Sequence, residues 1–257
     1  MNRLQNKTAI VTGTSRPNGI GAAICRELAN QGANIFFTHY TNYDHQLGFS
    51  DADRGYPDRL AEELRESGVR ASHASVDLSD PSTLAELLDQ VCSELGVPDI
   101  LVNNATHSID IDFMTLDADN LDPHYHVNLR GTALLSTAFA KRIDGREGGR
   151  IINLTSGQDR GPMPGNLAYA ATKGAVSAFT VSLAAELASR HITVNAVDPG
   201  PTATGWMTPE IEAHLLPRFP MGRIGKPEDA AKLIAFLASD DAAWITGQII
   251  HSDGGFR

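Results

Sequence analysis

The stretch Thr8–Gly32, TAIVTGTSRPNGIGAAICRELANQG, joins a short apolar strand pattern to a glycine-containing turn and a helical pattern. In the turn, Gly13, Gly19 and Gly21 carry no Cβ, so the backbone can approach a ligand closely. The helical pattern ends at Gly32, a residue type typical of the position after a helix. Because a helix N-terminus offers N–H donors and a partial positive charge, this strand–turn–helix unit predicts a dinucleotide site.

Apolar segments of strand type recur along the chain, with helical patterns between them. They are Thr8–Thr12, Ala33–Tyr40, Ala71–Val76, Asp99–Asn103, Arg150–Leu154, Ile192–Val197 and Gly247–His251. Strands that alternate with helices form βαβ units and a parallel sheet covered on both faces. No linker or repeat divides the chain, so residues 1–257 are predicted to be one α/β domain of Rossmann type, with a seven-stranded, mostly parallel sheet.

Composition and charge narrow the classes of function. Apolar residues make up 42% and charged residues 20% of the 257 residues, as in ordinary globular proteins. The net charge of −10 argues against nucleic acid or an anionic membrane as the main partner. Cys25 and Cys92 lack metal-ligand spacing and indicate buried thiols in a reducing compartment. The first strand begins too early for a signal peptide, and no apolar run has membrane-spanning length, so we expect a cytoplasmic location.

The ends of the second and third strands are positions where a dinucleotide's adenosine half is usually recognised. An NAD-binding chain normally carries an acid after the second strand, whereas this chain has His39, Tyr40 and Thr41. The polar segment Asn42–Pro57 follows, before an expected helix at Asp58–Ser67. It is longer than an ordinary connection, which indicates an insertion. After the third strand, Asp77 can accept a hydrogen bond from an adenine amino group, although a surface aspartate is the alternative.

Tyr169 and Lys173 are the candidate catalytic pair. They lie four residues apart in the helical segment Leu167–Ala188, so both side chains share one helix face. A buried cation next to the phenol should lower the pKa of Tyr169 and make it a usable general acid or base. Ser156, thirteen residues earlier, follows a strand and offers a second donor to the same substrate oxygen. A core ring beside a cation whose head reaches solvent is the alternative interpretation.

These motifs together resemble the short-chain dehydrogenase/reductase family over essentially the whole chain. Their order along the chain carries the likeness: the Gly13–Gly21 turn, Asn103-Asn104-Ala105, Asn128 in HVNLRG, Ser156, Tyr169, Lys173, Pro199-Gly200 with Thr204, and the tail ITGQIIHSDGGF. Each motif alone is weak to moderate evidence of membership. Their shared order and spacing make the resemblance specific.

The resemblance implies an oxidoreductase that moves a hydride between a nicotinamide and a carbonyl or secondary alcohol. Tyr169 would exchange the proton, Ser156 would hold the oxygen, and Lys173 would lower the Tyr169 pKa and bind the nicotinamide ribose. Asn128 would interrupt its helix and hold a water that relays protons to Lys173. The implied cofactor contacts are Gly13, Ser15, Arg16, Gly19, Ile20, Asp77, Leu78, Asn104, Tyr169, Lys173, Pro199, Gly200, Thr202 and Thr204.

Two features depart from the family pattern. Five residues separate Gly13 from Gly19, where the family usually has three. This length is closer to the divergent enoyl-reductase branch, but that branch spaces its Tyr and Lys farther apart than Tyr169 and Lys173. Thr106 stands where the family carries Gly, and a β-branched residue disfavours positive φ, so the loop near the nicotinamide should differ slightly.

The missing acid after the second strand favours NADP(H), with NAD(H) as the alternative. Arg16 resembles the basic residue that NADP-preferring relatives carry before their second glycine, and a guanidinium suits a phosphate. The inserted segment leaves the choice open. Asp44 or Asp51 could fold back and act as the missing acid, while Arg54 or Arg59 could do the opposite.

The substrate is predicted from the segment Ala203–Arg223, which resembles the family's substrate lid. It carries apolar residues such as Trp206 and Met207, so an apolar or acyl-chain substrate is expected. Similarity is strongest to 3-oxoacyl-carrier-protein reductases of fatty acid metabolism. The alternative is an alcohol or ketone dehydrogenase of another small molecule, because fold-level likeness does not decide the substrate.

Two other classes of function fit the sequence less well than an oxidoreductase. A non-catalytic dinucleotide sensor usually lacks part of the Tyr/Lys/Ser set, and a sugar-nucleotide epimerase usually has a larger C-terminal part. No metal is predicted, because His124 and His126 would not face each other on a helix. Helix Thr132–Arg142 and the tail Gly247–Phe256 are apolar on several faces, so we expect a homotetramer, with a homodimer as the alternative.

Overall fold

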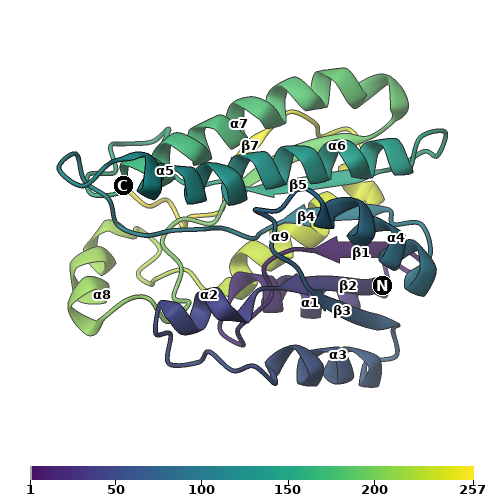
Figure 1. The fold of residues 1–257 in the computed structure, drawn as a ribbon, viewed down its shortest axis with the longest axis horizontal. Helices are drawn as coiled ribbons and strands as arrows, with labels where there is room; N and C mark the ends of the chain where they lie inside the picture. The colour runs from purple at the N-terminus through teal and green to yellow at the C-terminus, as the bar shows by residue number, and fades with distance from the viewer. Residues whose placement is uncertain (1) are drawn as a thin grey trace.

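The computed structural model describes residues 2–257 and is built on a seven-stranded sheet in the order β3-β2-β1-β4-β5-β6-β7 (Figure 1). The strands are β1 (Thr8–Val11), β2 (Asn34–His39), β3 (Ala71–Ser75), β4 (Ile100–Asn103), β5 (Arg150–Leu154), β6 (Thr193–Asp198) and β7 (Ile249–His251). Every strand pair is parallel. The expected Rossmann-type α/β fold is confirmed, and its sheet is wholly rather than mostly parallel.

Helices cover both faces of the sheet. They are α1 (Ile20–Asn30), α2 (Thr41–Gln46), α3 (Tyr56–Glu66), α4 (Thr83–Leu95), α5 (Ala118–His124), α6 (Thr132–Arg142), α7 (Leu167–Leu187), α8 (Pro209–Leu215) and α9 (Pro227–Ala238). A π-helix, η1 (Tyr125–Gly131), lies between α5 and α6, and the short 3₁₀ helices are η2 (Ala188–Arg190), η3 (Leu216–Arg218) and η4 (Asp240–Ala242).

Two apolar cores hold these layers together. Residues that alternate along a strand point to opposite faces of a sheet. On β1, Ala9 and Val11 belong to the core shared with α1, α3 and α9, whereas Ile10 belongs to the core shared with α4, α6 and α7. Figure 1 shows these two sets of helices on either side of the sheet. The near-continuous apolar strands of the sequence follow from burial on both faces.

The chain adds strands to the sheet on one side of β1 up to β3, and then continues on the other side of β1 from β4 to β7. The carboxyl ends of β1 and β4 meet at this point. The side-chain amide of Asn104 donates to the carbonyls of Thr12 (2.8 Å) and Gly13 (2.9 Å). Gly13 has φ +73°, and a Cβ on it would lie 2.5 Å from the Cα of Ala105. Only glycine allows this close approach. In folds of this type, ligands bind in the crevice at this point of the sheet, outside the carboxyl ends of the strands.

The inserted segment is more regular than its polar sequence suggests. It contains α2, and the next helix begins at Tyr56 instead of the expected Asp58. Pro57 in the first turn favours this start, and the Tyr56 side chain is buried in the core next to α1. In Figure 1, α2, α8 and the C-terminus lie at the same end of the molecule.

Two further expectations concern the thiols and the membrane. Cys25 and Cys92 are both free, with Cys25 buried and Cys92 half-buried. Within residues 2–257, none of the helices combines the length and the apolar character needed to cross a bilayer.

Candidate functional site

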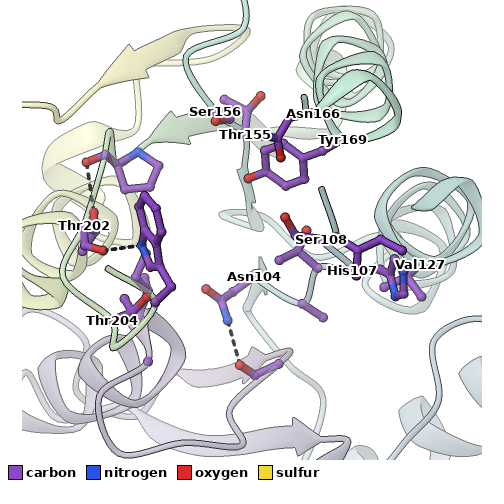
Figure 2. Close-up of a pocket in the computed structure, with 18 of the residues that line it drawn as sticks. Asn104, His107, Ser108, Val127, Thr155, Ser156, Asn166, Tyr169, Thr202 and Thr204 are labelled. Carbon is purple, nitrogen blue, oxygen red and sulfur yellow. Dashed lines mark hydrogen bonds between the residues drawn. The ribbon is translucent and has the colours of Figure 1, made fainter. Parts of the chain in front are cut away.

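A cleft of about 1480 Å³ opens at the carboxyl ends of the strands. Its wall comes from the turns after β1 to β6, from the beginnings of α2 and α7, and from α8 and the C-terminal tail. Figure 2 shows Ser156 and Tyr169 on one side of the open space, and Thr202 and Thr204 across from them.

Most of the site residues named from the sequence line this cleft. They are Gly13, Ser15, Arg16, Gly19, Ile20, Asp77, Leu78, Asn104, Ser156, Tyr169, Pro199, Gly200, Thr202, Thr204 and Trp206. Asn128, Lys173 and Met207 do not line it. Asn128 and Lys173 are instead buried behind the wall, and Met207 is half-buried.

The phenol of Tyr169 points into the cleft from the beginning of α7 (Figure 2). Burial raises its pKa to about 12, and a hydrogen bond with the Ser156 side chain opposes this rise. Asp198 and Tyr43 raise the pKa further, because each disfavours a phenolate beside it. The expected lowering of the Tyr169 pKa is therefore wrong, because loss of solvent contact outweighs the favourable hydrogen bond.

Lys173 is not among the groups that shift the pKa of Tyr169. Its Nζ donates to the carbonyl of Leu154 at 2.8 Å and lies 5.6 Å from the centre of the Tyr169 ring. Burial lowers the pKa of Lys173 to about 8. The shared helix face predicted from the four-residue spacing is present, but the ammonium is directed to the end of β5.

Asn128 connects the loop after β4 to α7. Its side-chain oxygen accepts from the His107 N–H (2.7 Å) and the Thr106 hydroxyl (3.1 Å). Its side-chain nitrogen donates to the His107 carbonyl (2.9 Å) and the Thr172 hydroxyl (3.1 Å). These four bonds fill the hydrogen-bonding capacity of the amide. Asn128 lies in the π-helix η1, a widened turn that often marks functional sites, and its proposed water relay stays a prediction.

Thr106 fits its position without strain. Among the described residues, only Asn6 and His191 are non-glycine residues with positive φ, so Thr106 has an ordinary backbone conformation. The hydrogen bond from its hydroxyl to Asn128 uses an atom that glycine lacks. The departure from the family's glycine thus strengthens the connection to Asn128.

The glycine turn fits the phosphates of a dinucleotide. Helix α1 begins at Ile20, directly after its N-cap residue Gly19, with no side chain capping its N-terminus and no acid in its first turn. Its N–H groups and partial positive charge are therefore available to a pyrophosphate. His39 Nδ1 and His107 Nε2 are buried without a hydrogen-bond partner, and both residues line the cleft. Unpaired buried polar atoms of this kind are expected where a ligand supplies the partner.

The inserted segment supplies a residue of the cleft wall, Tyr43, that was not predicted from the sequence. The hydroxyl of Tyr43 accepts from the Ser108 N–H (2.7 Å) and donates to the Ser108 carbonyl (3.1 Å), so α2 is joined to the loop after β4. Tyr43 and His107 also contact each other, with ring centres 5.2 Å apart. The unusual length of this segment was the only sequence signal for Tyr43, and His107 had none beyond its place after Asn103-Asn104-Ala105.

One group of side chains in residues 2–257 has the spacing of a metal site. The potential ligand atoms of Asp198, His251 and Asp253 lie within 4.8 Å of one another. His251 pairs with Asp198 at 2.8 Å and Arg160 pairs with Asp253 at 3.1 Å. Protein groups therefore already partner these side chains, and we assign no metal to them.

Both ring nitrogens of His124 are hydrogen-bonded to backbone groups. Its Nδ1 lies 2.9 Å from the Asn120 carbonyl, and its Nε2 accepts from the Ile109 N–H at 3.3 Å.

Three comparisons with known proteins bear on the site. A family model described as enoyl-(acyl carrier protein) reductase matches residues 13–257. An uncharacterized oxidoreductase of Bacillus subtilis, YjdA, is 53% identical over 100% of this chain and 99% of its own length. A 3-oxoacyl-[acyl-carrier-protein] reductase of Haemophilus influenzae is 36% identical over 98% of both chains. The solved structure of a short-chain dehydrogenase/reductase from Serratia marcescens is 35% identical, covers 99% of both chains and has a TM-score of 0.88.

The chain belongs to the short-chain dehydrogenase/reductase family. It is accordingly an oxidoreductase that depends on a nicotinamide dinucleotide. The resemblance inferred from the motifs is confirmed, including the similarity to 3-oxoacyl-carrier-protein reductases.

The buried ammonium of Lys173 leads to a prediction about stability. Its pKa in the folded chain is about 8 rather than 10.5, so between these values the folded protein binds fewer protons than the unfolded chain. Stability must then rise with pH in this range. In urea titrations without cofactor, we expect the wild type to gain about 2 kcal/mol over Lys173→Met between pH 7 and 10. A constant difference between the two proteins would contradict the assignment of a buried, protonated lysine.

Proposed function

We propose that this protein reduces the keto group of 3-oxoacyl thioesters with a nicotinamide dinucleotide. The observation that carries the proposal is the position of Ser156 and Tyr169 on one wall of a cleft that also contains the glycine turn. The two hydroxyls can meet one substrate oxygen while the dinucleotide occupies the crevice between β1 and β4.

The reduced nicotinamide, when bound, supplies the hydride to the carbonyl carbon. Tyr169 donates its proton to the oxygen, and its pKa of about 12 means that it carries this proton at neutral pH. Ser156 donates a hydrogen bond to the same oxygen and so stabilises the developing negative charge. Lys173 holds the end of β5 against α7. Its contact with the nicotinamide ribose, implied by the family resemblance, stays a prediction.

Apolar side chains on the far side of the cleft support an acyl substrate. Trp206, Ile211 and Leu215, from the proposed lid at residues 203–223, line the cleft together with Phe256. The Trp206 indole N–H donates to the Thr202 carbonyl at 2.9 Å, which helps to fix the ring in the wall of the cleft. An alcohol or ketone of another small molecule is the alternative substrate.

The substrate class can be tested with the purified protein. Consumption of NADH and NADPH is followed with acetoacetyl and longer 3-oxoacyl thioesters, 2-enoyl thioesters, and simple ketones. Turnover of 3-oxoacyl thioesters above all others is the expected result. Preference for the enoyl thioesters or for simple ketones would overturn the proposed substrate.

The role of Tyr169 gives the first mutational prediction. Tyr169→Phe removes the proton donor but keeps the ring, so kcat should fall at least about 10²–10⁴-fold. Binding of the nicotinamide dinucleotide, measured by fluorescence titration, should stay nearly unchanged. Tyr125→Phe is a matched control because Tyr125 is exposed and does not line the cleft. Substantial turnover by Tyr169→Phe would show that another group is the acid.

Trp206 tests the lid. Trp206→Ala should raise KM for long 3-oxoacyl thioesters more than for acetoacetyl thioester, because only long chains reach the indole and lost apolar contact costs about 25 cal/mol per Å². Phe113→Ala is the control, since Phe113 is exposed and lies outside the cleft. Equal changes in KM for short and long chains would make Trp206 a structural residue.

We further propose that the protein assembles as a homotetramer in the cytoplasm. Leu134 on α6 and Val181 on α7 are 42% and 49% exposed, and Trp244 near β7 is fully exposed. Apolar side chains of this size are more stable when a second copy covers them. The free thiols of Cys25 and Cys92 support a reducing compartment.

Light scattering at micromolar concentration should therefore give the mass of four chains, and Trp244→Glu should reduce it. A monomeric wild-type protein would contradict the assembly.

A further inference from the structure

Two unusual features of this sequence, the lengthened glycine turn and the inserted segment Asn42–Pro57, meet in space. The lengthened glycine turn carries Arg16 and Asn18, and the inserted segment carries Asp51. The Asn18 N–H donates to Asp51 at 3.2 Å, and Arg16 Nη1 donates to Asp51 at 2.7 Å. The extra residues of the turn and the inserted segment thus form one hydrogen-bonded unit at the entrance of the dinucleotide site.

This unit holds the guanidinium of Arg16 through its Nε and Nη1 atoms. Besides Asp51, its Nε pairs with Asp44 at 3.2 Å, and Nη1 donates to the Thr204 carbonyl at 3.0 Å. The Phe49 ring lies under its central carbon at 3.7 Å. The side chains of Arg16, Asp44 and Asp51 are only 11–12% exposed, so solvent screens these ion pairs weakly.

The charge at this position is negative. One guanidinium faces two carboxylates. His39, at the end of β2, adds no positive charge, because burial and the neighbouring His73 lower its pKa to about 4. A ribose 2′-phosphate would have to displace both carboxylates from Arg16 and would meet their repulsion. A free ribose hydroxyl meets neither obstacle.

Asp44 lies where a ribose-binding acid is needed. It lines the cleft and hydrogen-bonds the Ser15 side chain. The Ser15 hydroxyl in turn accepts from the Tyr40 N–H at 3.1 Å, directly after β2. Asp44 is therefore beside the strand end at which NAD-binding chains carry their acid, although it is several residues later in the sequence.

We propose that Asp44, oriented by Arg16 and Asp51, replaces the acid missing from the end of β2 and makes NAD(H) the preferred cofactor. Asp51 acts as a positioning residue that holds Arg16 away from the ribose. The preference for NADP(H) expected from the sequence required a guanidinium free to bind phosphate. This inference rests on the dinucleotide site of the proposed function but is independent of the substrate.

Binding of NADH and NADPH to the full-length protein, measured by calorimetry without substrate, tests the proposal. The wild type should bind NADH at least about tenfold more tightly than NADPH, because close charge pairs at binding sites are commonly worth this much. The double variant Asp44→Asn/Asp51→Asn frees Arg16 and should bind NADPH about tenfold more tightly than the wild type does. Asp44→Asn alone should weaken NADH.

Asp53→Asn is the matched control. Asp53 belongs to the same inserted segment but pairs with Arg59 at the surface, so its removal should leave the ratio of the two affinities unchanged. Thermal unfolding of each variant checks that it is folded. Arg16→Ala should not weaken NADPH more than NADH.

A wild type that binds NADPH more tightly, or an unchanged ratio in the double variant, would overturn the role of Asp44. Failure to bind either dinucleotide would overturn the proposed function as well.

Discussion

The contact between the ends of β1 and β4 is the constraint on which the site depends. The Asn104 amide holds the Thr12 and Gly13 carbonyls, and Gly13 lies so close to Ala105 that no side chain fits between them. This contact sets the separation of the two strands at the place where the sheet changes direction. It therefore positions the glycine turn for a pyrophosphate and the loop after β4 for the nicotinamide end of the cleft.

Burial governs the chemistry of the catalytic residues. The same loss of solvent that raises the pKa of Tyr169 lowers that of Lys173, because it penalises the charged form of each group. At neutral pH the phenol is thus protonated, as the proposed carbonyl reduction requires. Asn128 and Lys173 lie behind the cleft wall, where they hydrogen-bond the loop at His107 and the end of β5.

The inserted segment is unusual in length, and its residues form part of the wall of the cleft. Its helix α2 contacts the loop after β4 through Tyr43, and Asp44 and Asp51 engage Arg16 of the glycine turn. An insertion that merely extended a surface loop would leave Arg16 to solvent or to the ligand. Since these residues are largely buried, their charges would act with little screening on a dinucleotide bound in the cleft.

The sequence by itself determined the fold and named the candidate catalytic residues. Apolar strands alternating with helical patterns predicted the parallel sheet, and the spacing of Tyr169 and Lys173 placed them on one helix face; both are local signals that need no knowledge of distant residues. Strand ends were uncertain by one or two residues, and the helix at Tyr56 began earlier than expected.

Only the tertiary structure decided the partners of Arg16, the direction of the Tyr169 pKa shift and the joining of α2 to Ser108. Each of these depends on burial and on charges that are far apart in the chain, and no local pattern in the sequence encodes such distances.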